Sequence, residues 1–379
     1  MKDNKIMSDP IVIGPDHYNT LWLVRSLGMA GFNPFVIIVS SKSKSFVAKS
    51  RYCRNFVLVA SNESMLSMLI ERKVEGKSTI FTSSDAIAAC LDCNLHLLSD
   101  KYILQHCNNE QGGVLHWMKK ENMLAMAASC GLTIPKTKAY STNQQINMSE
   151  LVFPCLIKPE LSAESSKDNF RICKNELEFT SAINEIRDKC SRIVVQEYIQ
   201  SEYECLVYGV STDSEICLRG GLRKIHTCTS NNNLGMMSYA CLSREIPLQL
   251  MNLDAIKEFI RAIGYKGLFS VEFMITKDEA YFLEINLRND GTCYITTQAG
   301  VNLPAIWAYF AMGLDSSHLS RTLKRQCAYG MNEINYMKYT FSFRHMFKCI
   351  KEILKVSAFS LIKFDDMRPV LFKIINEFV

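Results

Sequence analysis

Four polar side chains on one predicted hairpin have the types and spacing to bind a metal ion next to a phosphate. Two apolar runs flank a short polar turn at Thr276–Glu279. Alternation along the two strands directs their polar residues to one face, namely Glu272, Glu284, Asn286 and Arg288. Carboxylate and amide oxygens are hard ligands, which Mg²⁺ accepts while it shares its shell with phosphates. We therefore predict a metal–nucleotide site, and the alternative is a half-solvated hairpin whose polar face meets water.

The first third of the sequence alternates strand and helix patterns. The predicted elements are strands and helices in turn, over 11–13, 18–30, 35–39, 55–59, 63–72, 79–82 and 85–93. Such alternation is typical of a small open parallel sheet. The turn after the first strand, at 14–19, lacks the GxGxxG spacing of a dinucleotide-binding loop, which counts against an NAD protein.

The middle of the chain has lysines in places suited to phosphate contact. A helix is predicted over 115–130, with Lys119 and Lys120 near its start. The next strand, 151–158, is apolar and ends on Lys158 directly before a proline. A lysine at the end of a buried strand can contact a phosphate as a point charge. These lysines are therefore candidate phosphate ligands.

The ordered motifs of the middle and of the hairpin resemble those of the ATP-grasp superfamily. The resemblance covers roughly residues 113–315, and the α/β region before it is similar to the domain that precedes ATP-grasp in these enzymes. The motifs are Lys120, IKP at Lys158, QEYI at Gln196–Ile199, Glu204, VEF around Glu272 and LEINLR at Leu283–Arg288. Within the superfamily, predicted carboxylate–amine ligases of the D-aspartate ligase type are most similar, through RSLG (Arg25–Gly28), SRYC (Ser50–Cys53) and FDDMRP (Phe364–Pro369).

This resemblance implies roles for the matching residues in binding ATP. Lys120 and Lys158 would contact the phosphates, with Lys119 as an alternative to Lys120. Glu204 would accept hydrogen bonds from the ribose hydroxyls, with Glu202 as an alternative. A hinge would grip adenine largely through backbone groups, and it comprises Gln196, Glu197, Tyr198 and Ile199.

The resemblance also implies the metal ligands and the groups that assist transfer. The ligands of Mg²⁺ (or Mn²⁺) would be Glu272, Glu284 and Asn286. Arg288, on the same strand face, would stabilise phosphate or an acyl-phosphate intermediate. Two further cations on another strand are expected near the γ-phosphate, Arg223 and Lys224.

These residue types agree with the joining of a carboxylate to an amine. Transfer of the γ-phosphoryl group converts the carboxylate to an acyl phosphate, and the amine then attacks its carbonyl carbon. Such chemistry needs charge neutralisation and positioning more than a protein nucleophile. We expect a carboxylate–amine ligase with small-molecule substrates, for example amino acids or cell-envelope precursors. The alternatives are a phosphotransferase that stops at phosphorylation and a catalytically silent ATP-binding regulatory module.

One segment departs from the family pattern. ATP-grasp phosphate loops are often glycine-rich, whereas Glu160–Asn169 contains no glycine. The hydroxyl groups of Ser162, Ser165 and Ser166 can replace backbone contacts there. A second polar loop, His226–Ser238, is expected to be mobile before substrates bind.

Composition excludes several classes of protein. A net charge of +5 with interspersed signs, in a chain of 379 residues, gives no reason to expect a nucleic-acid partner. No apolar run is long enough to span a bilayer. With no secretory leader, the 15 cysteines are expected to be reduced thiols of a cytoplasmic protein, and the helical context of Cys90, Cys93 and His96 favours packing over metal binding. A homodimer is left open.

The whole sequence predicts an α/β and α+β protein of three parts. An open parallel α/β domain is expected at 1–112, a two-subdomain ATP-grasp domain at 113–330 (113–195 and 196–330), and a helical extension at 331–379. In the extension, residues 338–363 include six lysines and arginines against one acid, Glu352. This amphipathic stretch is expected either to pack on the ATP-grasp body with a solvated basic face or to contact an anionic membrane surface.

Overall fold

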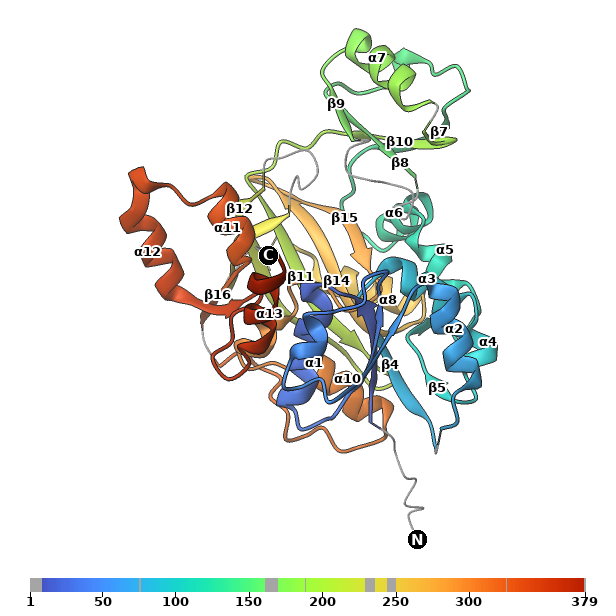
Figure 1. Cartoon of the computed structure of the whole chain (residues 1–379). Helices are drawn as coiled ribbons and strands as arrows, with labels where there is room; N and C mark the ends of the chain where they lie inside the picture. Colours follow the sequence, from blue (N-terminus) through green and yellow to red (C-terminus); the bar gives the residue numbers. More distant parts are fainter. Residues whose placement is uncertain are drawn as a thin grey trace.

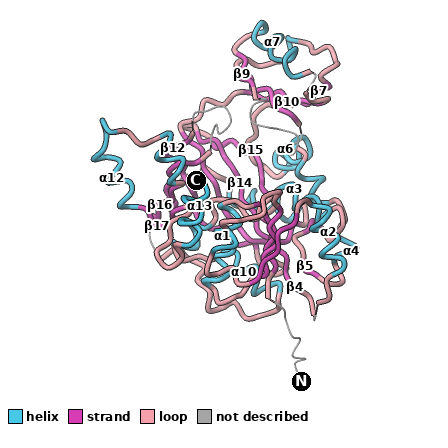
Figure 2. The backbone as a smooth tube through the Cα atoms, in the orientation of Figure 1, coloured by secondary structure: helices cyan, strands magenta, loops and turns pink. Residues whose placement is uncertain are grey.

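The chain folds into three β-sheets with helices packed on their faces (Figure 1). The computed structural model describes residues 9–377, except 75, 161–169, 188, 229–235, 244–249 and 325. Two of the sheets form the body of the molecule, and the third forms a separate lobe at the top of Figures 1 and 2. Within the described ranges, no helix has the length and apolar character that crossing a membrane requires.

The first third of the chain forms a five-stranded parallel sheet, here called the N-terminal sheet. Its strands in spatial order are β3 (Asn55–Val59), β2 (Phe35–Val39), β1 (Ile11–Pro15), β4 (Ser78–Thr82) and β5 (Tyr102–Ile103). The intervening helices are α1 (Tyr18–Met29), η1 (Val47–Lys49), α2 (Asn62–Glu71), α3 (Asp85–Asp92) and α4 (Leu95–Leu98). β1 and β4 are almost wholly buried because helices cover both faces, as is usual for parallel sheets. The predicted open α/β domain is confirmed.

The separate lobe is built on a four-stranded antiparallel sheet, the small sheet. Its strands in order are β7 (Thr137–Ser141), β10 (Arg192–Glu197), β8 (Cys155–Pro159) and β9 (Arg171–Cys173), and its helices are η2 (Met148–Glu150) and α7 (Glu176–Ile186). The apolar side of α7 packs on the sheet, where Phe179 and Ile186 join Ile157 and Ile193 in a core of their own. The lobe can therefore hold its shape independently of the body.

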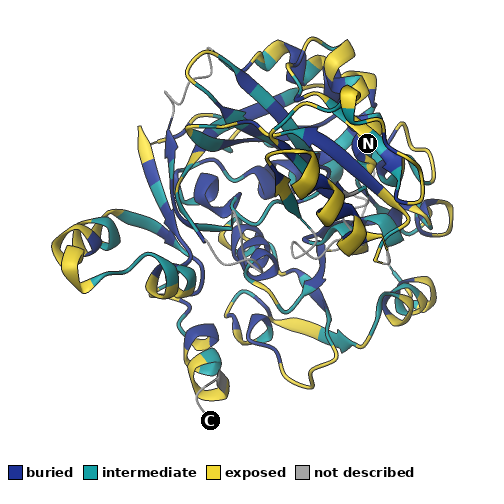
Figure 3. Cartoon of the chain, turned by 90° about the horizontal axis from the view of Figure 1, so that it is seen from above, coloured by how far each residue is buried: buried dark blue, intermediate teal, exposed yellow. Residues whose placement is uncertain are grey.

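The third sheet, the large sheet, has eight strands and carries helices on both faces. Its main strands in order are β15 (Ala280–Asn286), β14 (Tyr265–Ile275), β11 (Tyr203–Ser211), β12 (Ile216–Thr227), β13 (Met237–Ser243), β16 (Cys327–Met331) and β17 (Val356–Phe359), and β6 (His106–Cys107) pairs with β14. One face packs on α6 (Lys120–Ser129) and α8 (Leu253–Ala262). The other face packs on α1, α9 (Tyr294–Gln298) and α10 (Leu303–Ala311). Figure 3 shows the buried strands inside these helical layers.

The helix predicted over 115–130 is two helices that meet at Lys119. α5 (Gly113–Met118) ends and α6 begins at this residue, whose backbone is extended (φ −70°, ψ 124°). The break exposes Lys119 and buries Lys120 at the start of α6. Neither glycine nor proline stands at this position, so the sequence pattern predicts one continuous helix.

The carboxy-terminal tail is helical, and it also contributes to the large sheet. Its helices are α11 (Glu333–Tyr339), η6 (Phe343–His345), α12 (Met346–Lys355) and α13 (Arg368–Glu377). Between α12 and α13, β17 pairs in parallel with β16 at the edge of the large sheet. The expectation of a helical tail missed this strand, because its four residues are too few to show an alternation pattern.

A buried ion pair joins the three sequence motifs that pointed to one branch of the family. Arg25 of RSLG donates from Nε to Asp366 Oδ2 of FDDMRP at 2.9 Å, and neither side chain is exposed to solvent. Ser50 and Arg51 of SRYC also donate to Asp366, from Oγ at 2.7 Å and from the backbone N–H at 2.8 Å. Arg25 Nη2 donates to the carbonyl of Leu361 at 2.8 Å. These motifs therefore fasten the end of the chain to α1.

Replacing Asp366 with asparagine is expected to destabilise the fold strongly. The change leaves the charge of Arg25 buried without its carboxylate, and such a loss costs about 3–5 kcal/mol in the free energy of unfolding. Chemical denaturation of the variant measures it. Asp365→Asn is the matched control, because Asp365 is part-exposed and its pair with Arg51 spans 3.8 Å, so it should cost less than about 1 kcal/mol. Equal costs for the two variants would show that the buried pair is not special.

Candidate functional site

Two carboxylates face each other across adjacent strands of the large sheet. β14 and β15 pair antiparallel, with Glu272 directly opposite Glu284 and Ser270 opposite Asn286. The predicted hairpin and the meeting of its acidic residues are therefore present in the structure. Like charges placed directly opposite each other destabilise a sheet unless other groups compensate them.

Lysines from two other elements supply that compensation. Lys120 at the start of α6 places Nζ 3.1 Å from Glu284 Oε2, and its side chain is 7% exposed. Lys224 of β12 places Nζ 3.7 Å from Glu272 Oε2 and 2.5 Å from Glu204 Oε2 of β11. Each carboxylate of the hairpin therefore has a lysine partner, and the two lysines arrive from opposite sides of the pair.

The two carboxylates differ in their affinity for protons. Attraction to Lys120, with a further contribution from Lys158, lowers the pKa of Glu284 to about 2 although burial opposes it. Burial raises the pKa of Glu272 to about 7. Attraction to Lys224 opposes this rise, and repulsion from Glu284 and Asp290 adds to it. Glu284 is thus firmly ionised, and Glu272 holds a proton more readily.

Lys158 reaches the same place from the small sheet. Its Nζ donates to Gln196 Oε1 at 2.8 Å, and both residues are buried. Burial lowers the pKa of Lys158 to about 7, repulsion from Lys120 adds to the lowering, and Glu284 opposes it. A buried lysine held by a neutral amide gains most from an arriving anion. The site therefore lies where the lobe meets the body.

The segment predicted as the adenine hinge connects the two sheets. Gln196 and Glu197 end β10 of the small sheet, and the chain then enters β11 of the large sheet at Tyr203. Tyr198 donates its N–H to the Pro154 carbonyl at 3.0 Å, and Ile199 is buried. The position of this segment suits a hinge, while its contact with adenine stays a prediction.

The geometry separates the alternatives that the sequence left open. Lys120 is buried against Glu284, whereas Lys119 is exposed at the bend before α6. Glu204 contacts Lys224. Glu202 is exposed, and its backbone N–H donates to the carbonyl oxygen of Ile275 at the end of β14. Lys120 and Glu204 are therefore the members of each pair that contact the lysine–carboxylate cluster, while Glu202 lines the same groove as Glu204.

Arg288 lies in the site and is fixed by a residue that the sequence reasoning missed. Its Nε and Nη2 donate to the two carboxylate oxygens of Asp85 at 2.7 and 2.6 Å, and Nη2 also donates to Asn286 Oδ1 at 3.0 Å. Asp85 begins α3 directly after β4, at the carboxyl edge of the N-terminal sheet. Ligands bind at that edge of open parallel sheets, and this is the signal that could have found Asp85.

Asp290 is a second acidic group that the sequence reasoning missed. Its charge acts on Glu272, Lys224 and Arg288, so it lies within the same electrostatic cluster. Its Oδ1 accepts from the backbone N–H of Thr292 at 2.7 Å. The carboxylate therefore adds a negative charge to the cluster that Glu272, Lys224 and Arg288 form.

Arg223 lies on the opposite face of β12 from Lys224. Neighbouring residues of a strand point to opposite faces, and Arg223 pairs with Cys205 and Cys241 on the face away from Glu272. Its guanidinium lies over the Tyr203 ring at 4.1 Å and lines an open groove of about 640 Å³. Lys224 alone of this pair reaches the carboxylates. Glu204 and Lys224 line the same groove, so the role of Arg223 near the γ-phosphate stays a prediction.

The ligand set suits a cation that is shared with phosphate. In the part of the chain that the structure describes, no cluster of three or more His, Cys, Asp or Glu side chains can hold a metal ion. Glu272, Glu284 and Asn286 offer two carboxylates and an amide oxygen, which suits Mg²⁺ because it is often bound by one or two carboxylates together with phosphates and water. The segment Glu160–Asn169 beyond Glu160, and the middle of the loop His226–Ser238, lie outside the described residues.

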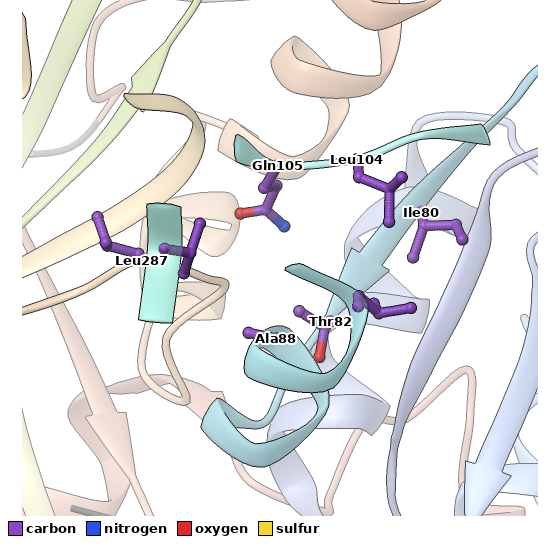
Figure 4. Close-up of a pocket in the computed structure, with 8 residues that line it drawn as sticks. Ile80, Thr82, Ala88, Leu104, Gln105 and Leu287 are labelled. Atoms are coloured by element: carbon purple, nitrogen blue, oxygen red, sulfur yellow. The ribbon is translucent and has the colours of Figure 1, made fainter. Parts of the chain in front are cut away.

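A small cavity lies between β4 and α3 of the N-terminal sheet and Leu287, which follows β15 of the large sheet (Figure 4). It measures about 10 Å³, and Thr82, Ala88, Gln105 and Leu287 are among its lining residues. The amide Nε2 of Gln105 is buried without a hydrogen-bond partner. A cavity of this size holds about one water molecule, so it is too small for a substrate.

Comparisons with known proteins agree with this geometry. A family model described as "ATP-grasp in the biosynthetic pathway with Ter operon" matches residues 243–333. Formate-dependent phosphoribosylglycinamide formyltransferase of Wolinella succinogenes is 24% identical over 150 residues, which cover 39% of this chain and 37% of that protein. The chain thus spans less than two fifths of the length of the curated relatives that it matches first.

Solved structures share the fold over most of the chain. N5-carboxyaminoimidazole synthetase from Staphylococcus aureus, complexed with ADP, has a TM-score of 0.68 at 14% identity and covers 88% of this chain and 86% of its own. L-amino acid ligase from Bacillus licheniformis has a TM-score of 0.65 at 13% identity and covers 85% of this chain and 79% of its own. The chain therefore has the fold of these ATP-grasp enzymes, and residues 243–333 match an ATP-grasp family model.

Proposed function

We propose that this protein is an ATP- and Mg²⁺-dependent ligase that joins a carboxylate to an amine. The observation that carries the proposal is the meeting of Lys120 and Lys158, from the body and the lobe, at the paired carboxylates Glu272 and Glu284. In this buried cluster, the two lysines can release the carboxylates and bind phosphate oxygens, and the two carboxylates can then bind the cation. A core built only for stability would more readily be apolar.

The chain's own residues account for nucleotide binding in this proposal. Lys120 and Lys158 turn from Glu284 and Gln196 to the phosphate oxygens, so that their charges neutralise the polyphosphate. Glu272, Glu284 and Asn286 hold Mg²⁺, which when bound supplies further charge neutralisation and aligns the phosphates for transfer. Glu204 meets the ribose hydroxyls, and the hinge at 196–199 holds the adenine.

Arg288 accounts for the second half of the reaction. A carboxylate oxygen of the substrate attacks the γ-phosphorus, the bond to ADP breaks, and an acyl phosphate forms. The amine nitrogen then bonds to the carbonyl carbon as phosphate leaves, and the nitrogen loses a proton. Arg288 is aimed at this region by Asp85, so it can stabilise the leaving phosphate. The carboxylate of Asp290 lies on the same side, where it favours a protonated amine on approach.

The relatives support this class of reaction without naming the substrates. The similar proteins include a formate-dependent formyltransferase, an L-amino acid ligase and an N5-carboxyaminoimidazole synthetase. Each name is compatible with a small carboxylate or an amine as a reactant. The carboxylate and the amine of this protein are therefore proposed as small molecules, with amino acids as the first class to test.

Phosphate release in pooled substrates tests the proposal. The protein is incubated with ATP, Mg²⁺ and pooled amino acids, and phosphate is measured as each carboxylate and amine is withdrawn. Release that depends on both supports a ligase. A stable phosphorylated product would show a phosphotransferase instead, and no ATP turnover under any mixture would show a silent nucleotide-binding module.

Replacing Glu284 with glutamine is expected to abolish ATP turnover without unfolding the protein. The change removes a metal ligand and the partner of Lys120, so activity should fall on the order of 100-fold or more. Phosphate release measures the loss, and circular dichroism verifies the fold. Asp278→Asn, in the exposed turn of the same hairpin, is the control and should retain activity. Near-normal turnover in the Glu284 variant would refute the metal assignment.

Binding of ATP is expected to weaken as the pH rises through about 7. Lys158 is charged below its pKa of about 7 and neutral above it, so above that pKa binding must first recruit a proton. Above this pKa, the affinity for ATP should fall by at most about tenfold for each pH unit. Calorimetric titration with ATP across this range measures the slope.

The variant Lys158→Arg separates the effect of Lys158 protonation on ATP binding from the effect of protonation of ATP itself. Arginine keeps its charge throughout the range, so the variant should show a flatter pH dependence than the wild type. The same slope in both proteins would mean that Lys158 does not titrate in the nucleotide site.

A further inference from the structure

The hairpin of α11 and α12 stands at the edge of the molecule, at the left of Figures 1 and 3. One side of α12 attaches it to the large sheet. Glu352 accepts a hydrogen bond from the Tyr336 hydroxyl and lies 3.1 Å from His226 Nε2 of β12. Cys349 on the same side is buried. The helix is therefore held firmly, and its opposite side is left for solvent.

That opposite side presents a row of large apolar side chains. Phe343, Phe347, Ile350 and Leu354 recur every three or four residues, so they share one side of η6 and α12. Their exposed fractions are 84%, 79%, 44% and 80%. On α11, Met337 is also 55% exposed. A contiguous apolar row of this kind on the surface marks a contact with another apolar phase.

A row of cations runs beside the apolar row. Arg344, Lys348, Lys351 and Lys355 are all exposed and repeat with the same spacing. The one acid of α12, Glu352, is turned inward to His226 and Tyr336. The free surface of this helix therefore combines large apolar side chains with positive charge, and none of its own acids offsets that charge.

We propose that α12 docks on the surface of an anionic lipid bilayer. A helix that has aromatic and aliphatic residues on one side and lysines beside them lies in the plane of the interface. The apolar row, which begins at Phe343 and ends at Leu354, enters the boundary between headgroups and acyl chains. The basic row meets the phosphate headgroups, whose negative charge it complements. The protein thereby contacts the membrane from one side without crossing it.

A second copy of the chain fits the same surface less well. Two copies of α12 that pair antiparallel through their apolar rows bring like flanks together, so the lysines of one helix face the lysines of the other. Repulsion between these rows opposes such a dimer. An anionic bilayer satisfies both the apolar row and the basic row at once.

Vesicle sedimentation with the full-length protein tests the proposal. The wild type is expected to bind vesicles of mixed phosphatidylcholine and phosphatidylglycerol, to bind pure phosphatidylcholine more weakly, and to dissociate as salt is raised. Each basic residue at an anionic surface contributes roughly a fivefold change in partitioning. Lys348→Gln with Lys351→Gln should therefore reduce binding to the anionic vesicles by about 25-fold.

Substitutions in the apolar row provide the second arm. Phe347→Ser with Leu354→Ser should remove binding to the anionic vesicles, whereas Leu177→Ser, equally exposed on α7 of the lobe, should leave it unchanged. All of these side chains are exposed, so thermal unfolding should be unaffected, and a calorimetric scan verifies this.

The other outcomes overturn the proposal. Failure of the wild type to sediment with anionic vesicles does so, as does unchanged binding in the Phe347/Leu354 variant. A dimer in solution that the same variant converts to a monomer, without binding to vesicles, would show that a second copy covers α12.

Discussion

The repulsion between Glu272 and Glu284, placed opposite each other on β14 and β15, is the constraint around which the site is built. It is tolerable because Lys120 and Lys224 approach from α6 and β12, so the carboxylates need the large sheet and its helix to be in place. The same compensation prepares the site for its ligand. A polyphosphate and a cation can replace the lysine–carboxylate pairs with lysine–phosphate and cation–carboxylate pairs, so each charged side chain of the cluster keeps an opposite charge beside it.

Two ion pairs join the N-terminal domain to later parts of the chain, and they have different roles. Arg25–Asp366 is fully buried and holds the chain end on α1, so its role is to stabilise the fold. Arg288–Asp85 is only part-buried and lies at the carboxyl edge of the N-terminal sheet, where a substrate can approach it. The N-terminal domain therefore contributes to the proposed reaction through the arginine that it orients.

Much of the fold and the centre of the site could be predicted because both leave local patterns. Alternation identified the strands of the N-terminal sheet and placed Glu272 and Glu284 on one face. Asp85 and Asp290 left no such pattern, since their partners are distant in the sequence or belong to another strand. Parity also places Arg223 and Lys224 on opposite faces of β12, and only Lys224 contacts the carboxylates. The bend at Lys119 was missed because helix propensity continues through it.

The tail shows a different limit of sequence reasoning. An amphipathic pattern says that one side of a helix is apolar, but the pattern does not say what covers that side. In α12 the inward side carries Glu352, whose contacts with His226 and Tyr336 attach the helix to β12 and α11, and Cys349 and Ile353 pack beside it. A packed amphipathic helix normally turns its apolar side inward. Here the inward side already holds Cys349, Ile353 and the anchoring acid, so the second apolar row, with Phe347 and Leu354, faces outward beside the lysines.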